Sequence, residues 1–240
     1  MKLIIDIGNS GAKFALYEGR DKVAARRMEI ITWSGVKEVL KNYNPDMAIV
    51  SSVNQIPPVL LKILADNMNF YHILSQESIL PFTVKYETPE TLGSDRLSAV
   101  AGAVMHFPGF DALVIDAGTA LTFDIIINKE YQGGAISPGI DIRFKALNTF
   151  TRKLPLIKRS GTVSYPAKTT ETSINAGVIS GVVFEINEYI RTFVTKYQDA
   201  KIILTGGDGA FLQDLISGDV IYMPDIVTDG LNFILDYNAK

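Results

Sequence analysis

The chain has 240 residues, of which 47% are hydrophobic and 20% charged, enough apolar material for one large domain or two small ones. Its formal net charge of −3 gives no basic excess that would predict a nucleic-acid partner, and no apolar run is long enough to predict a membrane span. The absence of cysteine excludes disulfides, thiolate nucleophiles and cysteine-ligated zinc, and it fits a cytoplasmic protein.

The first half of the chain predicts an α/β pattern. Residues 2–7 form a buried apolar strand, and Gly8-Asn9-Ser10-Gly11 turns the chain into a second strand at residues 12–17. Because a strand follows this turn, and not a helix, the pattern excludes both the Rossmann loop and the P-loop. The next expected elements are a helix at 33–43, a strand at 47–52, a helix at 57–68 and a strand at 71–74.

A helix is expected from Ser94 to about residue 107, after a loop at residues 75–93. One of its faces carries small residues and could accept close packing from another helix or another subunit. Packing within the chain alone is the alternative. The small residues are Ala99, Ala101, Gly102 and Ala103.

The second half repeats the opening of the first. Leu-Val-Ile-Asp-Ala-Gly-Thr-Ala at 113–120 matches Leu-Ile-Ile-Asp-Ile-Gly-Asn-Ser at 3–10, which sets Asp6 and Asp116 110 positions apart. We therefore expect two similar lobes, residues 1–110 with a first phosphate loop and residues 111–240 with a second loop and glycine-rich turns. The expected elements are strands at 112–116, 121–127 and 201–205, turns at 117–120, 133–139 and 206–209, and helices ending near 149, spanning 173–197 and following 209.

Asp6 and Asp116 are the first candidates for chemistry. Each ends a buried strand, where an unpaired charge is unfavourable, and each has a glycine two residues later. A carboxylate, a close-approach glycine and a nearby hydroxyl suit a metal–phosphate complex. The alternative is that each aspartate caps its own turn.

Three further features could serve the same site. Lys13 lies close to the first loop and could reach phosphate, although a solvated strand lysine is the alternative. Thr119 and Thr122 offer hydroxyls after the second loop, but threonine is also a common strand residue. Gly93-Ser94-Asp95-Arg96 combines a turn, a candidate base and a candidate carboxylate ligand, or it caps the helix that begins there.

These features together predict an ATP-using enzyme with two similar lobes of the duplicated actin/Hsp70-like (ribonuclease H-like) and sugar-kinase architecture around a central ATP cleft. The acceptor of the phosphate is open at this point, since fold does not fix it.

The motifs then resemble one family, the type III pantothenate kinases, in chain order from residue 6 to about 209. Any one motif is modest evidence, whereas the ordered set is specific. The motifs are Asp6-Ile7-Gly8-Asn9-Ser10, Gly93-Ser94-Asp95-Arg96 with Tyr86 upstream, Asp116-Ala117-Gly118-Thr119-Ala120-Leu121-Thr122-Phe123-Asp124, Gly133-Gly134-Ala135-Ile136-Ser137-Pro138-Gly139, and Ala146-Leu147 with Leu154-Pro155.

The resemblance implies the first committed step of coenzyme A synthesis, in which ATP and pantothenate give ADP and 4′-phosphopantothenate. Asp95 would take the proton from the pantothenate hydroxyl. Magnesium would accompany ATP near Asp6, and Asp116 would hold a monovalent cation, potassium or ammonium. ATP would be lined by Asp6, Ile7, Gly8, Asn9, Ser10, Gly11, Ala12, Lys13 and Thr119, and pantothenate by Tyr86, Gly93, Ser94, Asp95 and Arg96.

The resemblance also implies a homodimer, because Thr170 aligns with a family threonine that touches pantothenate from the partner subunit. The segment Thr169-Thr170-Glu171-Thr172 replaces a more usual Asn-Thr, so Thr169 and Thr172 stay alternatives. Ser10 replaces the usual threonine but keeps the hydroxyl.

Two other functions compete with this assignment. One is a non-catalytic relative that regulates expression, which the retained Asp6, Asp95, Arg96 and Asp116 disfavour. The other is a kinase or phosphatase of the same fold with another acceptor, which the Gly-x-Asp-Arg motif with Tyr86 disfavours.

Overall fold

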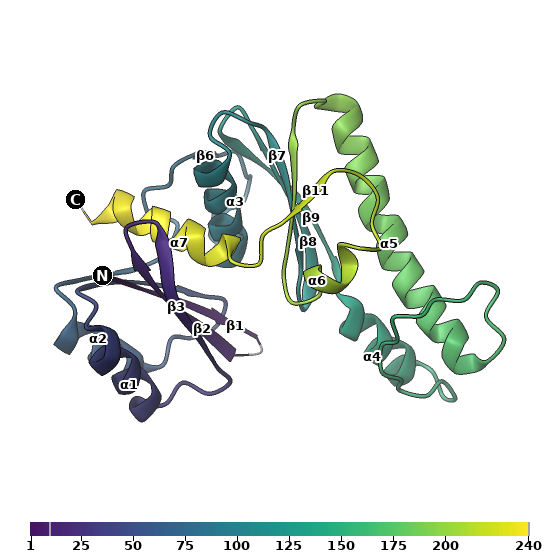
Figure 1. The fold of residues 1–240 in the computed structure, drawn as a ribbon, viewed down its shortest axis with the longest axis horizontal. Helices are drawn as coiled ribbons and strands as arrows, with labels where there is room; N and C mark the ends of the chain where they lie inside the picture. The colour runs from purple at the N-terminus through teal and green to yellow at the C-terminus, as the bar shows by residue number, and fades with distance from the viewer. Residues whose placement is uncertain (10, 240) are drawn as a thin grey trace. The chain divides into compact units, whose positions relative to one another are not determined.

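The computed structural model describes residues 1–9 and 11–239, and the chain divides into two compact units (Figure 1). Unit 1 contains Met1–Gly109, Asn128–Gln132 and Asp225–Lys240, whereas unit 2 contains Phe110–Ile127 and Gly133–Pro224. This division differs from a single cut after residue 110, because the C-terminal segment packs with the N-terminal residues. Ser10 of the first loop lies outside the described residues.

Unit 1 is built on a five-stranded sheet in the order β3-β2-β1-β4-β5. The first three strands are antiparallel neighbours, and β1, β4 and β5 are parallel. The β1–β2 hairpin confirms that a strand, not a helix, follows the first glycine turn. The strands are β1 (Lys2–Gly8), β2 (Gly11–Glu18), β3 (Asp21–Met28), β4 (Met47–Ser52) and β5 (Phe70–Ile73).

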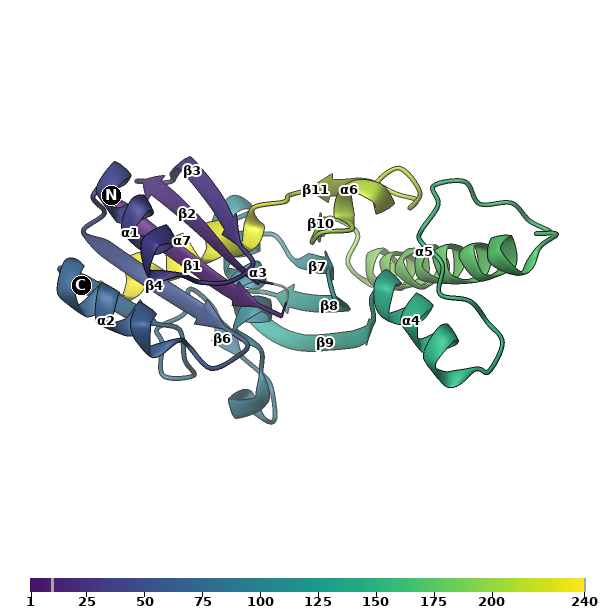
Figure 2. The same ribbon diagram turned by 90° about the horizontal axis from the view of Figure 1, so that it is seen from below.

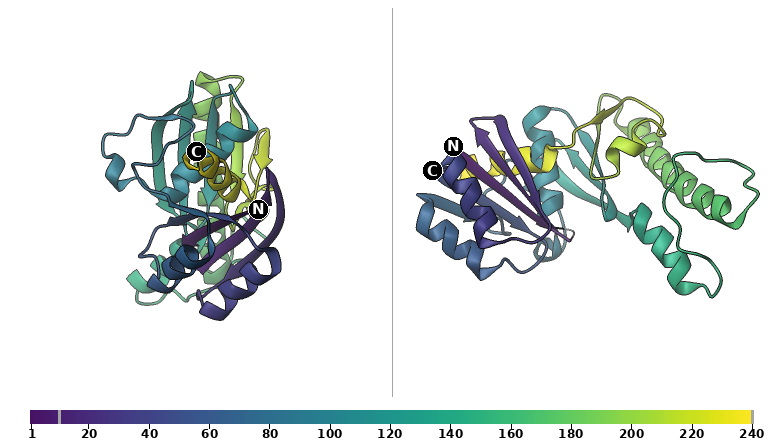
Figure 3. Two further views of the ribbon diagram at one scale, coloured as in Figure 1. Left: turned by 90° about the vertical axis from the view of Figure 1, so that its left-hand side faces the viewer. Right: turned by 60° about the horizontal axis from the view of Figure 1, so that its bottom comes forward.

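Helices cover both faces of this sheet, α1 and α2 on one and α7 on the other (Figures 1 and 3). Leu3 and Ile5 of β1 pack in one core cluster with residues of α1 and α2. The helices of unit 1 are α1 (Trp33–Tyr43), α2 (Pro58–Asn67), α3 (Ser94–His106) and α7 (Ile226–Asn238), with a 3₁₀ turn at Pro89–Thr91.

The small-residue face of α3 is covered by α7 of the same unit, so the structure shows the alternative of packing within the chain. A Cβ placed on Gly102 would overlap the backbone carbonyl of Ile226, and one placed on Gly230 would overlap that of Ser98. Glycines on both helices therefore allow their backbones to touch. The buried Tyr17 hydroxyl of β2 donates to Asp229 of α7 at 2.6 Å, and His106 lies 2.9 Å from the same carboxylate.

Unit 2 repeats the topology of unit 1. The second sheet has the order β11-β10-β7-β8-β9-β6, so that β9-β8-β7-β10-β11 matches β3-β2-β1-β4-β5. As in unit 1, the first two strands form an antiparallel hairpin and the next pairs are parallel. The strands are β7 (Ala112–Ala117), β8 (Ala120–Ile127), β9 (Glu130–Pro138), β10 (Lys201–Thr205) and β11 (Val220–Tyr222), and β6 (Thr83–Val84) pairs with the unit 1 residues of β9.

The core of unit 2 lies between this sheet and the long helix α5, whose Ile179, Val182 and Ile186 pack with strand residues. Figure 2 shows α4 and α5 at the end of the unit where β8 begins and β9 ends. The helices are α4 (Ile140–Phe150), α5 (Thr170–Lys196) and α6 (Gly209–Leu212). Within residues 1–9 and 11–239, none of the helices combines the length and the apolar character that a membrane span requires.

The expected elements differ from the observed ones mainly at polar or glycine-rich segments. Residues 133–138, expected as a turn, belong to β9, and α5 begins at Thr170, three residues before the expected start. β3, β11 and α7 were not expected from the sequence pattern. The α/β class and the duplicated arrangement are confirmed.

Candidate active site

Asp6 lies in β1, between two strands that supply polar neighbours. It is paired in register with Lys13 of β2 and with Ser51 of β4. Burial raises the pKa of Asp6 to about 6, the negative charge of Asp95 adds to the rise, and Ser51 and Lys13 oppose it. The carboxyl is therefore a half-buried acid whose ionised form is disfavoured by burial, so that a nearby cation would stabilise it.

We expect Asp6→Asn to raise the free energy of unfolding at pH 8 by about 2–3 kcal/mol, from a pKa shift of roughly two units. The folded-state pKa lies above the ordinary value of 3.8, so the stability that Asp6 contributes is present below pH 4 and is lost as the pH rises through 6. The gap between the variant and the natural protein should shrink from pH 8 to pH 5. Urea denaturation at both pH values measures this, and a gap that widens would contradict it.

Asp95 lies in the first turn of α3, where Gly93 is the N-cap and makes no side-chain cap bond. The Asp95 carboxylate accepts from the backbone N–H of Arg96 at 2.8 Å, so the capping alternative is met in part. It also folds back over Gly93, where a Cβ would overlap Oδ1. Because Asp95 contributes to the pKa of Asp6, the two carboxyls share one electrostatic environment.

Ser94 ties this turn to the sheet. Its hydroxyl donates to the carbonyl of Ser52 at 3.2 Å, and it lies 3.0 Å from the hydroxyl of Ser51. Since Ser51 also hydrogen-bonds the Asp6 carboxyl, a short chain of polar groups joins β1, β4 and the start of α3. A cavity of about 280 Å³ opens beside Gly93 and Ser94 and is lined on its other side by Gln76 and Glu90.

Arg96 is buried beneath two tyrosine rings of unit 1. Its guanidinium carbon lies 6.0 Å from the centre of the Tyr86 ring and 5.9 Å from that of Tyr131, and the two rings lie 6.0 Å apart. The guanidinium therefore lies beside both aromatic rings, where a cation is favoured. The structure brings together the predicted Tyr86 and Arg96 and adds Tyr131, a fully buried residue of β9.

Lys13 projects from β2 and forms an ion pair with Asp225, with 2.7 Å between Nζ and Oδ1. Lys22 of β3 pairs with the other oxygen of the same carboxylate. Burial acts to raise the pKa of Asp225, but hydrogen bonds from Lys13 and Lys22 outweigh it and lower that pKa. Lys13 is therefore not the solvated strand lysine of the alternative expectation.

The remaining residues of the first loop frame Asp6. Ile7 and Ala12 are buried, Gly8 and Gly11 are partly buried and end the two hairpin strands, and Asn9 is exposed at the tip. Gly11 has φ of 125° and its Cβ would crowd the carbonyl of Met28, so the position favours glycine.

In unit 2, Asp116 is the penultimate residue of β7 and is paired in register with Thr122 and Thr205. Several backbones converge on its loop. A Cβ on Gly206 would overlap Ala117 and the Asp116 carboxylate, and one on Gly139 would overlap the carbonyls of residues 118 and 119. The turns that contain Gly139 and Gly206 therefore pack against the loop at residues 116–119, and Gly206 lies against the Asp116 carboxylate itself.

The predicted threonines differ in their surroundings. Thr119 is exposed in the turn after Asp116, whereas Thr122 is buried and donates to Asp124 at 3.2 Å. Thr169 and Thr172 bond each other in a capping box that starts α5. Thr170 takes no part in this capping box, and its side chain is exposed.

Three residues of the site were not singled out from the sequence: Ser51, Tyr131 and Asp225. Ser51 reaches Asp6 only through strand pairing, and Asp225 reaches Lys13 from 212 positions away in the chain. The signal available for Tyr131 was an aromatic residue beside the Gly133-Gly134 motif.

Comparisons with known proteins identify the family of the chain. A family model described as type III pantothenate kinase matches residues 2–192. Type III pantothenate kinases of Phocaeicola vulgatus and Cytophaga hutchinsonii are 41% and 34% identical to the chain, over the full length of both sequences in each case.

Solved structures show the same fold. A Campylobacter jejuni protein described as a Baf family transcriptional activator is 27% identical and superposes with a TM-score of 0.63, covering 99% of this chain and 98% of its own. A glucokinase from an Antarctic psychrotroph, 12% identical, superposes with a TM-score of 0.55 over 98% of each chain. The latter shows the fold alone, that of the sugar-kinase-like ATPases.

Proposed function

The chain belongs to the type III pantothenate kinase family, and from this we propose that it transfers the γ-phosphoryl group of ATP to the hydroxyl of pantothenate, giving ADP and 4′-phosphopantothenate. The observation that carries the proposal is the pairing of Asp95, at the start of α3, with the raised-pKa Asp6 of the first loop. A cytoplasmic location fits a reaction that consumes ATP.

Asp95 is proposed as the general base. Its carboxylate accepts the proton of the pantothenate hydroxyl as that oxygen attacks the γ-phosphorus, and the bond to ADP breaks. A base within reach of the acceptor hydroxyl serves phosphoryl transfer because positioning and electrostatics supply most of the acceleration. Ser94 fixes the turn that carries Asp95, through its bond to the carbonyl of Ser52.

The residues of the first loop are proposed to line the ATP phosphates, from Asp6 to Lys13 with Ser10 included, and Thr119 to contact ATP. Asp6 fits a magnesium ligand, since a metal ion would relieve the unfavourable burial of its charge. Magnesium usually takes one or two protein carboxylates together with nucleotide phosphates, and its charge offsets the negative charge of the phosphates. Such a site needs no dedicated cage of protein ligands.

Pantothenate is proposed to lie against Tyr86, Gly93, Ser94 and Arg96. Its carboxylate suits the guanidinium of Arg96, which presents planar donors that match a carboxylate. The two tyrosine rings beside Arg96 restrict its orientation. The cavity beside Gly93 and Ser94 offers room next to the proposed base.

Asp116 is proposed to hold a monovalent cation, potassium or ammonium. The support is local, since Gly206 lets the backbone of its turn approach this carboxylate, and Gly139 lets a second turn pack on the carbonyls of Gly118 and Thr119. Backbone carbonyls and a single carboxylate form a donor set of oxygen atoms with low charge, which suits a large monovalent ion.

A homodimer is proposed, with Thr170 of one subunit contacting the pantothenate of the other. Unit 2 exposes large apolar side chains around α5, with Phe150, which lines the same cavity as Thr170, 86% exposed, and Tyr165 and Phe184, which line a second cavity, 94% and 70% exposed. Two cavities of about 1000 and 760 Å³ run along this face of α5. An exposed apolar patch of this kind is typical of a protein interface, and a second copy of the chain is the partner that the family predicts.

The alternative function is regulatory, because the Campylobacter jejuni neighbour is described as a transcriptional activator. The paired carboxyls favour catalysis, since a protein that only binds has no need of a base beside a phosphate loop.

The decisive experiment measures pantothenate-dependent ADP release from Mg-ATP in potassium, ammonium or sodium salts. We expect turnover that requires pantothenate and rises with potassium or ammonium, and we expect Asp116→Asn to remove the rise. ADP release that does not depend on pantothenate in any of the salts would contradict the proposed function, and a regulatory role or another acceptor would then have to be tested.

A further inference from the structure

Lys13 is held by an acid from the far end of the chain. Its position opposite Asp6 in the β1–β2 hairpin places its backbone beside the first phosphate loop. Its ammonium pairs with Asp225, the residue immediately before α7. Lys13 thus connects the proposed phosphate loop with the helix that closes unit 1.

The side chain of Asp225 has no evident role in starting its own helix. Although Asp225 is the N-cap of α7, its carboxylate makes no cap bond. The first turn of the helix is instead bonded to the backbone carbonyl of Asp225, which accepts from the hydroxyl of Thr228 at 2.9 Å and from the N–H of Asp229 at 2.9 Å. The carboxylate is therefore available to the two lysines that reach it.

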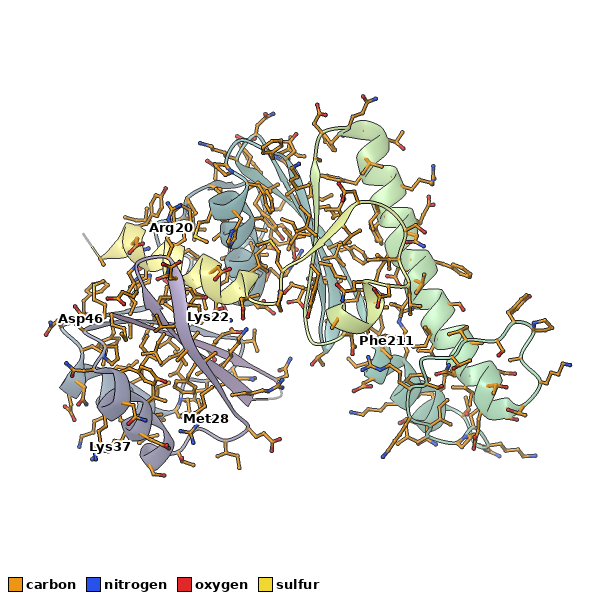
Figure 4. The ribbon with its side chains drawn as sticks, viewed as in Figure 1. Arg20, Lys22, Met28, Lys37, Asp46 and Phe211 are labelled. Atoms are coloured by element: carbon orange, nitrogen blue, oxygen red, sulfur yellow. The ribbon has the colours of Figure 1, made fainter. Side chains whose placement is uncertain are left out.

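The charges of Lys13, Lys22 and Asp225 favour an ordered position for the Lys13 ammonium. Lys13 and Lys22 share one carboxylate, so the three groups together carry a net positive charge next to a loop proposed to bind phosphates. Figure 4 shows Lys22 near the start of α7, on the hairpin that follows Lys13. Two lysines keep the Asp225 carboxylate ionised, as its lowered pKa indicates.

Lysine has a long flexible stem, and ordering such a side chain on binding lowers affinity. An ammonium also has three donors, so that it can keep one carboxylate while it donates to a phosphate oxygen. An acid that orders the stem in the free enzyme removes part of the ordering cost from the binding step.

We propose that Asp225 is a positioning residue for the nucleotide, which holds the ammonium of Lys13 over the first loop ready to bind a phosphate of ATP. This inference rests on the proposed function, since it takes Lys13 as a phosphate ligand. It gives Asp225, at the start of α7, a role in nucleotide binding, although this residue lies outside the motif of the first loop.

The test is calorimetric titration of the purified full chain with Mg-ATP in the absence of pantothenate. We expect Asp225→Asn, which keeps the size of the side chain and removes its charge, to raise Kd about three- to tenfold, the effect of one disordered long side chain. Asp225→Glu should recover part of the loss, because it restores the carboxylate.

If the inference is right, Asp225→Asn raises the Kd for Mg-ATP because it releases the side chain of Lys13. We expect Lys13→Met to raise Kd at least as much as Asp225→Asn, and the double variant to bind no more weakly than Lys13→Met alone. Lys22→Met is the matched control, since it removes the other lysine of the same carboxylate, and its Kd should change less than twofold.

Several outcomes would overturn the inference. An unchanged or lower Kd for Asp225→Asn would mean that the carboxylate does not prepare Lys13. Equal losses from Lys22→Met and Asp225→Asn, which change the local charge in opposite directions, would mean that disruption of the whole ion-pair cluster weakens binding, and not the orientation of Lys13. A natural protein that binds no Mg-ATP would instead refute the proposed function, and an unchanged Kd for Lys13→Met would remove Lys13 from the phosphate site.

Discussion

Asp95→Asn is expected to lower kcat by about 10²–10⁴-fold while leaving the affinity for Mg-ATP largely intact. The amide keeps the size of the carboxylate but accepts no proton from the pantothenate hydroxyl. Steady-state turnover and calorimetric Mg-ATP binding, measured on the same preparation, separate the two effects. Because Asp95 contributes to the raised pKa of Asp6, the acidic limb of ATP binding should also move to lower pH.

The chain contains a matched control for this substitution. Asp141 occupies the same place in α4 as Asp95 in α3, in the first turn after a glycine N-cap without a side-chain cap bond. Asp141→Asn therefore reports any loss that comes only from the interaction of a carboxylate with a helix N-terminus. Its turnover should stay within about twofold of the natural protein. Near-normal turnover of Asp95→Asn would remove Asp95 from the role of base.

Gly230→Ala is expected to lower the free energy of unfolding by at least about 2 kcal/mol, at the upper part of the range for an overpacked core. The added methyl would overlap the carbonyl of Ser98 and press on the N–H of Gly102, both backbone atoms of α3. Backbone cannot rotate away as a side chain can, so α7 must shift. This loss should exceed the roughly 1 kcal/mol by which alanine favours a helix over glycine.

Gly207→Ala is the comparison for that change, because no atom lies within 4 Å of its Cβ position and its φ is not positive. It should change the stability little or raise it slightly. Urea denaturation followed by circular dichroism, without ligand, measures both variants. If Gly230→Ala were as stable as Gly207→Ala, the α3–α7 contact would be looser than the structure shows.

Much of the fold could be predicted because apolar runs and glycine turns mark its strands. The hairpin after Asp6 and its repeat after Asp116 follow from an apolar strand, a turn and a second apolar strand. β3 could not be predicted in this way, because it is a charged edge strand with its side chains mostly exposed. The sequence predicts a turn at residues 133–138 of β9, because Gly133, Gly134 and Pro138 are residues that usually end strands.

The candidate site divides in the same manner. Asp6, Asp95 and Asp116 stand in short motifs whose chemistry is local, so their sequence surroundings indicate them. Ser51 and Asp225 act by contact with residues far away in the chain, at distances that only strand pairing and helix docking determine. α7 itself lacks a side-chain cap and carries a glycine in its middle, so its pattern predicted no helix.

The discontinuity of unit 1 has a consequence for how the protein is made. Residues 1–109 leave the ribosome well before residues 225–240, while 110–127 and 133–224 form a separate unit in between. Translation proceeds at about 5–20 residues per second. For several seconds the nascent N-terminal half therefore exposes the small-residue face of α3, and Lys13 cannot form its ion pair because Asp225 has not yet been synthesised. Chains cut short before α7 should be recognised by chaperones and proteases, and a kinase with a formed first loop should arise only from a chain translated to its last helix.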